Sequence, residues 1–200
     1  MDTTTFKLGH STVPCGRQGP WSLEEFEISE SEAALNNMRC MWNRQRVFML
    51  SPGRYKRLVH DQRGVVMSNT AMEIRSNREA WRAATGHVLI NGLGMGMLLE
   101  AILAKPDVTA VRVIEIDADV IALVGPHFAH DPRVTIVHAD AYAYKPARGE
   151  VFDFAWHDIW DDITVDNLKN MARLTRKYRR PRVKAQAVWS RSIIQSLCQR

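Results

Sequence analysis

Three glycines at alternate positions have a spacing that could serve chemistry: Gly92, Gly94 and Gly96 follow the apolar stretch 87–91 and precede a helical pattern that begins at Met97. The first glycine can adopt a positive φ, the second lets the main chain approach a ligand, and the third allows a helix to start close to a sheet. A dinucleotide fingerprint would need a glycine at position 97, and no phosphate-binding G-x-x-x-x-G-K-[ST] motif occurs. The spacing therefore favours a cofactor that lacks a pyrophosphate.

An acidic residue follows this turn at a distance that strengthens the interpretation. Glu115 lies near the end of the next predicted strand, 110–116, about twenty residues after the glycines. A carboxylate at that place can accept hydrogen bonds from both ribose hydroxyls of a nucleoside. The alternative to a cofactor site is that the glycine turn serves only the packing of strand and helix, and that Glu115 is an ordinary surface residue. Two features at a fixed spacing favour a nucleoside cofactor.

The elements that position these residues form a regular alternation of strands and helices. This pattern predicts parallel strands joined by right-handed crossovers, which is an α/β fold with a Rossmann-like, doubly wound, mostly parallel sheet. Few residues follow the last strand, so we expect a sheet curtailed at the C-terminus, with an exposed edge that could favour a homodimer. Strands are predicted at 87–91, 110–116, 133–139, 151–157 and 182–190, and helices at 97–105, 118–124, 164–177 and 191–199.

The first 85 residues predict a flexible lead-in and a small appendage. Residues 1–20 lack the basic start and apolar core of a secretory signal and are expected to be a flexible lead-in. Residues 21–85 predict a helix, a β-hairpin and a second helix, and residues 86–200 the cofactor-binding domain. Two S-x-x-E patterns, at 22–25 and 29–32, are typical of helix starts, and the second predicts a helix over 29–44. The hairpin falls within 54–69 and the second helix within 71–84.

From about Leu58 to Asp162 the chain resembles class I S-adenosylmethionine-dependent methyltransferases, most closely the branch that contains the spermidine synthases. The resemblance rests on "NGLGMG", "VIEID" and "HADAYAY". It implies that the glycine turn holds the methionine part of the cofactor and that Glu115 holds the ribose. It also implies that Ile116 lies against one face of the adenine and that Asp140 binds the adenine amino group. The implied cofactor-binding residues are Asn91, Gly92, Leu93, Gly94, Glu115, Ile116, Asp140 and Ala141.

The stretch "FDFAWHDIWDD" offers candidate catalytic groups at the end of the fourth predicted strand. In spermidine synthases a D-x-x-D element there helps to deprotonate the attacking amine, and Asp158 and Asp161 match its spacing. The resemblance therefore makes Asp158 the first candidate for a catalytic carboxylate, able to hold an amine or hydroxyl between aromatic neighbours. His157 alternates with Asp158 and is expected to point the other way. Asp161 and Asp162 could instead cap the following helix.

Two departures from the spermidine synthases distinguish between possible functions. Those enzymes carry an aspartate in the glycine turn that receives the free amine of decarboxylated cofactor, and Met95 stands there in this chain. Their tyrosine- and histidine-bearing amine-binding segment has no clear counterpart in 69–81. We therefore expect S-adenosylmethionine-dependent methyl transfer to an acceptor that the sequence does not identify. The alternatives are an aminopropyltransferase and a non-catalytic protein that binds the cofactor or nucleic acid.

Composition limits the remaining classes of partner. No Asp or Glu follows Asp166, whereas ten basic residues do, so this segment could bind nucleic acid or simply be a solvated basic surface. Three separated cysteines without a C-x-x-C pair favour a reducing, cytoplasmic location. No apolar run approaches the roughly 20 residues of a membrane span. His127 and His130 lack further ligands nearby, so no metal site is expected.

Overall fold

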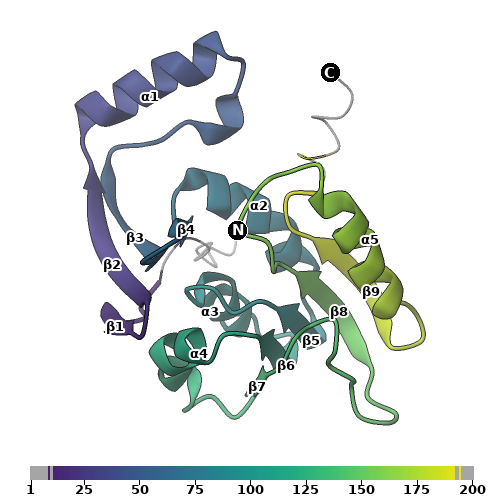
Figure 1. Cartoon of the computed structure of the whole chain (residues 1–200). Helices are drawn as coiled ribbons and strands as arrows, with labels where there is room; N and C mark the ends of the chain where they lie inside the picture. Colours follow the sequence, from purple (N-terminus) through teal and green to yellow (C-terminus); the bar gives the residue numbers. More distant parts are fainter. Residues whose placement is uncertain (1–8, 10, 192–193, 195–200) are drawn as a thin grey trace.

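The computed structural model describes residues 9, 11–191 and 194, and contains two sheets. Figure 1 shows the smaller sheet and its helix on one side and the larger sheet on the other. The larger sheet has five strands in the order β7-β6-β5-β8-β9, and all four pairings are parallel. Its strands are β5 (Gly86–Asn91), β6 (Val108–Glu115), β7 (Val134–His138), β8 (Phe152–His157) and β9 (Val183–Val188).

Because the chain adds strands first on one side of β5 and then on the other, the sheet has a switch point at the C-terminal end of β5. Open α/β sheets bind ligands at such a point. The predicted α/β fold with a doubly wound parallel sheet is confirmed, and β5 to β9 lie within two or three residues of their predicted bounds. No sixth or seventh strand of this sheet occurs within the described residues. Most of the predicted helix at 191–199 lies outside them.

Successive side chains of a strand point to opposite faces of the sheet, so each face carries apolar side chains. Helices cover both of these faces. Val88 and Ile90 contribute to a core that also contains α3 (Met97–Leu103) and α4 (Ala118–Val124). Leu89 between them faces the second core, which includes Leu174 of α5 (Asn167–Lys177). A short 3-10 helix, η2 (Gly125–Phe128), follows α4, and α2 (Ala71–Ala83) packs beside α3.

The smaller sheet is antiparallel, with strands in the order β1-β2-β3-β4. They are β1 (Gly16–Gln18), β2 (Trp21–Ile28), β3 (Gly53–His60) and β4 (Gly64–Ser68), so the predicted hairpin is confirmed. Two expectations were wrong. Ser22 and Glu25 lie in β2 and cap no helix. The expected flexible lead-in does not hold for 11–20, because β1 pairs with β2 and Val13 is fully buried.

Helix α1 (Glu30–Trp42) and the 3-10 helix η1 (Arg46–Phe48) are inserted between β2 and β3. Ser29 and Glu32 form the predicted capping box, which confirms the start of this helix. Figure 1 places α1 at the far end of the long β2 and β3 strands. Its larger apolar side chains are exposed and build no core, although their helical spacing is that of a buried face. They are Leu35, Met38, Met41 and Trp42.

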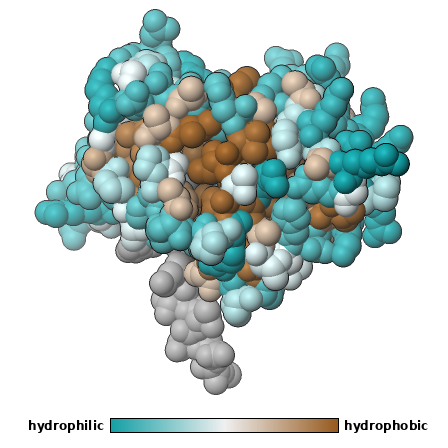
Figure 2. Space-filling view, turned by 90° about the horizontal axis from the view of Figure 1, so that it is seen from below, coloured by the Kyte–Doolittle hydropathy of each residue, from teal (hydrophilic) through white to brown (hydrophobic). Residues whose placement is uncertain are grey.

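Apolar surface also occurs elsewhere on the molecule. In the view of Figure 2, hydrophobic residues gather in the middle of one face between hydrophilic margins.

Of the helices in the described residues, none has the length and apolar character needed to cross a bilayer. The strands β7 and β9 form the edges of the larger sheet. Pairing of two copies through an edge therefore stays a prediction.

Candidate functional site

The glycine turn after β5 is held in a conformation that favours glycine. Gly92, Gly94 and Gly96 have φ values of +98°, +53° and +78°. A Cβ at Gly92 would lie 1.8 Å from the carbonyl oxygen of Asp158, and one at Gly94 would lie 2.5 Å from the Met67 sulfur. The absent side chain of Gly94, expected to leave room for a ligand, thus leaves room for Met67. The turn fixes the end of β5 against both β8 and the smaller sheet.

Glu115, the last residue of β6, is fixed by main-chain hydrogen bonds. One carboxylate oxygen accepts from the Leu93 N–H at 2.8 Å, and the other accepts from the Asp117 N–H at 2.9 Å. The residue is 8% exposed and lines a cavity at the C-terminal ends of the strands. Two amide donors make this carboxylate a rigid acceptor. Its remaining lone pairs are available to hydroxyl groups of a bound nucleoside.

The cavity has a volume of about 390 Å³ and lies between the two sheets. Such a volume lies within the usual range for small-molecule sites, ~300–1,000 Å³. The floor comes from β5, β6 and β8, and the smaller sheet contributes Trp21 and Met67. Trp21 donates its Nε1–H to Asp117 at 2.8 Å, and Arg63 lies over the Trp21 ring. The smaller sheet therefore covers the cavity.

Most of the predicted site residues lie together in the lining of this cavity. Ile116 is 66% exposed there, which is unusual for a large apolar side chain and suits the flat face of a base. Asp140 has one oxygen bonded to the Tyr142 N–H at 2.7 Å. The predicted residues found in the lining are Gly92, Leu93, Gly94, Glu115, Ile116, Asp140, Ala141 and Asp158.

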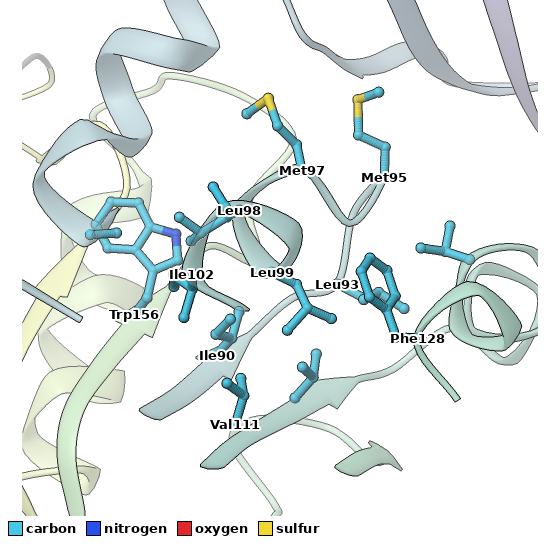
Figure 3. Packing of buried hydrophobic residues seen from close by; sticks show 14 of the residues in the cluster. Ile90, Leu93, Met95, Met97, Leu98, Leu99, Ile102, Val111, Phe128 and Trp156 are labelled. Carbon is cyan, nitrogen blue, oxygen red and sulfur yellow. The ribbon is translucent and has the colours of Figure 1, made fainter. Parts of the chain in front are cut away.

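Asn91 and Met95 are not brought into this lining. Asn91 is fully buried, its amide nitrogen lies 2.7 Å from His157 Nδ1, and its Oδ1 has no hydrogen-bond partner among the described residues. The Asn91 side chain is therefore engaged outside the cavity, and its assignment as a cofactor-binding residue stays a prediction. Met95 is fully buried, and its N–H points to the Met67 sulfur at 3.2 Å. Figure 3 shows Met95 and Met97 projecting to the same side of the turn.

His157 points away from the cavity, as its alternation with Asp158 predicted. Its Nε2 lies 3.0 Å from Gln186 Oε1, and its ring stacks on Tyr178 at 5.2 Å between centroids. Burial lowers the pKa of His157 to about 4, and the contact with Gln186 opposes this shift only in part. A neutral imidazole sealed between two strands and α5 supports the fold and cannot reach a ligand in the cavity.

Asp158 and Glu73 bring two carboxyl groups to the same end of the cavity. Burial raises the pKa of Asp158 well above its ordinary range, and the nearby Glu73 carboxylate raises it further. Burial also raises the pKa of Glu73 to about 7, and hydrogen bonding from Trp189 and Ser76 opposes this shift only in part. Trp189 Nε1 and Ser76 Oγ each lie 3.2 Å from the same carboxylate oxygen, but Ser76 Oγ lies closer, at 2.9 Å, to the Glu73 carbonyl oxygen. Sequence reasoning missed Glu73.

A signal for Glu73 exists in the sequence of α2. Glu73, Asn77 and Ala80 recur at spacings of four and three residues, and all three are buried. A carboxyl group in the buried register of a helix is unusual and is retained mainly where it has a task. Periodicity alone does not distinguish such a glutamate from an exposed one, because the apolar pattern of this helix is irregular.

The other acidic residues after β8 have structural partners. Asp161 forms an ion pair with Arg63 at 2.6 Å across the mouth of the cavity. The Asp162 carbonyl accepts a bond from Asn167 Nδ2 at 2.7 Å. Helix α5 begins at Asn167 and its N-cap residue is Asp166, so the expectation that Asp161 or Asp162 caps this helix was wrong.

Several basic residues of the C-terminal segment make contacts within the fold. Lys177 donates to the Tyr142 carbonyl at 2.7 Å, Arg173 lies over the Tyr142 ring at 4.8 Å, and Lys184 pairs with Asp153 at 2.6 Å. Binding of this segment to nucleic acid stays a prediction. No group of three or more metal-binding side chains occurs in the part of the chain that the structure describes.

Known proteins similar in sequence match only a segment of this chain, and no family model matches it. A segment is 38% identical over 81 residues to polyamine aminopropyltransferase 2 of Caldanaerobacter subterraneus subsp. tengcongensis, which is 38% of this chain and 27% of that protein. Two aminopropyltransferases of Ralstonia nicotianae are each 34% identical over 83 residues, 37% of this chain and 16% of theirs. The matches thus span about a quarter or less of these relatives.

Solved structures with a similar arrangement include methyltransferases and a spermidine synthase. The 23S rRNA methyltransferase ErmE is 19% identical, with 57% of this chain and 45% of that chain covered and a TM-score of 0.43. Spermidine synthase from Thermotoga maritima is 24% identical, with 51% and 42% covered and a TM-score of 0.35. The local sequence match to aminopropyltransferases agrees with the predicted resemblance to the spermidine synthase branch, and neither comparison identifies an acceptor substrate.

Proposed function

We propose that this protein is an S-adenosylmethionine-dependent methyltransferase. The observation that carries the proposal is the Glu115 carboxylate, held by two main-chain N–H groups at the switch point of a parallel sheet. A carboxylate fixed in this way is preorganised for the two hydroxyls of a ribose. It lies in a cavity closed by a second sheet, which excludes water from a displacement reaction.

The side chains next to Glu115 fit the rest of a nucleoside. Ile116 offers an exposed apolar face for the base, and Asp140 offers a carboxylate that can accept from an exocyclic amine. Trp21, fixed by its bond to Asp117, closes the cavity beside them. When bound, S-adenosylmethionine would supply a methyl group on a sulfonium, and the residues of this chain would align it with the acceptor and exclude water.

An aminopropyltransferase is the second candidate, because the curated relatives carry that name and Asp158 and Asp161 keep the D-x-x-D spacing. Two observations count against it. Met95 occupies the place of a carboxylate in the glycine turn and is fully buried outside the cavity lining. Asp161 is engaged by Arg63. The turn therefore offers no side-chain anion to the free amine of a decarboxylated cofactor.

Binding measurements with the two cofactors distinguish these candidates. The intrinsic fluorescence of the cavity tryptophans can be followed as S-adenosylmethionine or decarboxylated S-adenosylmethionine is added. We expect S-adenosylmethionine to bind at least as tightly as the decarboxylated form, because no negative side chain in the turn repels its carboxylate or attracts the free amine of the other. Tighter binding of the decarboxylated form would favour aminopropyl transfer, and no response to either at millimolar concentration would refute both.

A further inference from the structure

Helix α1 carries its large apolar side chains on an exposed face. Leu35, Met38, Met41 and Trp42 are 48%, 62%, 59% and 88% exposed. At the roughly 100° per residue of an α-helix, these side chains and the exposed Ala34 lie within an arc of about 120°. A helix normally turns an apolar stripe of this width toward a core, and apolar surface left exposed marks an interaction site. We call these five residues the α1 stripe.

The opposite face of α1 is held by the segment that returns to β3. The Asn36 side chain donates to the Phe48 carbonyl oxygen at 3.0 Å. The Asn37 side chain donates to the Leu50 carbonyl oxygen and accepts from the Leu50 N–H, both at 2.8 Å. The residues that α1 buries are small, an alanine and a cysteine. Three hydrogen bonds therefore fix the outward direction of the α1 stripe, because rolling the helix to bury it would break them.

The place of α1 in the molecule leaves room for a partner. Figure 1 shows α1 at the tip of the long β2 and β3 strands, apart from the larger sheet. The helix has 13 residues and is therefore about 20 Å long. A partner that covers the α1 stripe has to offer an apolar surface of similar length. The α1 helix of a second copy offers such a surface.

The charged residues of α1 are divided between its two ends. Glu30 and Glu32 lie in the first turn, whereas Arg39 lies in the last turn and Arg44 and Arg46 follow it, and all five are exposed. In an antiparallel pair of two such helices, the acidic start of each lies beside the basic end of the other. A parallel pair would bring like charges together. A membrane-binding helix would carry basic residues along its polar face. The charge pattern therefore favours a second copy in antiparallel orientation.

We propose that α1 is a self-association site, at which two copies of this chain pair their α1 helices in antiparallel orientation about a two-fold axis. With Met38 at the axis, Leu35 lies beside Trp42 of the second copy, and Ala34 lies beside Met41 of the second copy. A two-fold contact needs one surface that is complementary to itself, and α1 provides it. This inference is independent of the proposed function, and the contact differs from pairing through a strand edge.

Sedimentation velocity of the full chain over a range of micromolar concentrations tests this site. We expect a reversible equilibrium of monomer and dimer, because a contact between two short helices is at the small end of protein interfaces. Met38→Glu should raise the dissociation constant at least about tenfold, since it places two carboxylates across the axis. Val65→Glu is the matched control, because it adds the same charge at an exposed apolar position of β4, and it should leave the equilibrium unchanged.

Disulfide trapping tests the antiparallel orientation. The single-cysteine changes Ala34→Cys and Met41→Cys are made in a background in which Cys15 and Cys198 are replaced by serine. We expect an oxidised mixture of the two proteins to give a covalent dimer that contains one copy of each. Each protein alone should give much less covalent dimer, because identical positions of an antiparallel pair lie apart unless they are at the axis.

Two results would overturn the self-association site. One is a protein that stays monomeric at hundreds of micromolar. The other is a Met38→Glu variant that keeps native circular dichroism and dimerises as strongly as the wild type. Cross-linking of each single-cysteine protein with itself, at least as efficient as in the mixture, would overturn the antiparallel orientation.

Discussion

Glu115 and Glu73 are buried to a similar degree in one cavity, at 8% and 5% exposure, but their surroundings differ. Glu115 accepts from two main-chain N–H groups of neighbouring strand ends. Glu73 accepts from two side chains, and burial raises its pKa to about 7. Main-chain donors come with the fold itself, whereas the indole of Trp189 lies 116 residues away in sequence. The carboxylate at one end of the cavity is thus fixed by main-chain groups of the sheet, and the carboxyl group at the other end is fixed by side chains.

This difference assigns a different task to each end. A carboxylate that the backbone fixes suits a constant part of a ligand, such as a ribose. A carboxyl group placed by side chains on a helix outside the sheet suits a part of the ligand that varies from one protein to another. Substitutions at the two ends of the cavity test this division.

Gly92→Ala should have the largest effect, because it disturbs both ends at once. The new Cβ would meet the Asp158 carbonyl oxygen at 1.8 Å, and φ is +98°. We expect a loss of about 2–5 kcal/mol in unfolding free energy, since left-handed strain contributes ~1–2 and overpacking ~1–3 kcal/mol. Urea unfolding measures it. Gly149→Ala is the control, with φ of +83° and open space around its Cβ, and equal losses in the two variants would contradict this account.

Glu115→Gln should reduce both stability and nucleoside binding. The amide has one acceptor oxygen, so one of the N–H groups of Leu93 and Asp117 loses its partner. We expect about 2 kcal/mol of destabilisation, the usual cost of an unsatisfied buried group. Glu27→Gln, on an exposed position of β2, should leave unfolding unchanged. A fully stable Glu115→Gln variant would show that the backbone does not depend on this carboxylate.

Glu73→Gln should change how stability depends on pH. The folded protein keeps a proton on Glu73 up to about pH 7, whereas the ordinary value is 4.5. Between these values the folded state binds more protons than the unfolded state, so stability falls as the pH rises. The variant should lose less stability than the wild type between pH 4.5 and 7, by an amount on the order of 2 kcal/mol. Identical pH profiles of the two proteins in urea unfolding would rule out a buried, proton-binding Glu73.

Trp21→Phe should have the smallest effect, because it removes one hydrogen bond at the edge of the cavity. The loss of the Nε1–H bond to Asp117 is worth about 1 kcal/mol. We expect the affinity for S-adenosylhomocysteine to fall a few-fold in calorimetry. The control Trp42→Phe changes an 88% exposed indole on α1 and should leave this affinity unchanged. An unchanged affinity in Trp21→Phe would contradict the assignment of Trp21 to the wall of the nucleoside site.

The sequence predicts well the strands that form one end of the cavity. Hydrophobic periodicity and turn residues locate β5, β6 and β8, and the ends of parallel strands converge, so the positions of Gly92 and Glu115 follow from local pattern, whereas Asp158 was predicted from the resemblance to the spermidine synthases. The other end depends on contacts that local pattern does not contain. Glu73 contacts Trp189 only because α2 packs against the larger sheet. The strand β2 was not predicted, because its S-x-x-E pattern is also typical of a helix start. The exposed apolar face of α1 likewise has the spacing of a buried one.

Calorimetric titration of S-adenosylhomocysteine into the wild type, Glu115→Gln and Glu73→Gln proteins tests the division of the cavity most directly. We expect S-adenosylhomocysteine to bind the wild type, to bind Glu115→Gln at least about tenfold more weakly because a charge-assisted hydrogen bond is lost, and to bind Glu73→Gln with unchanged affinity. Equal weakening in both variants, or no binding to the wild type, would contradict this division.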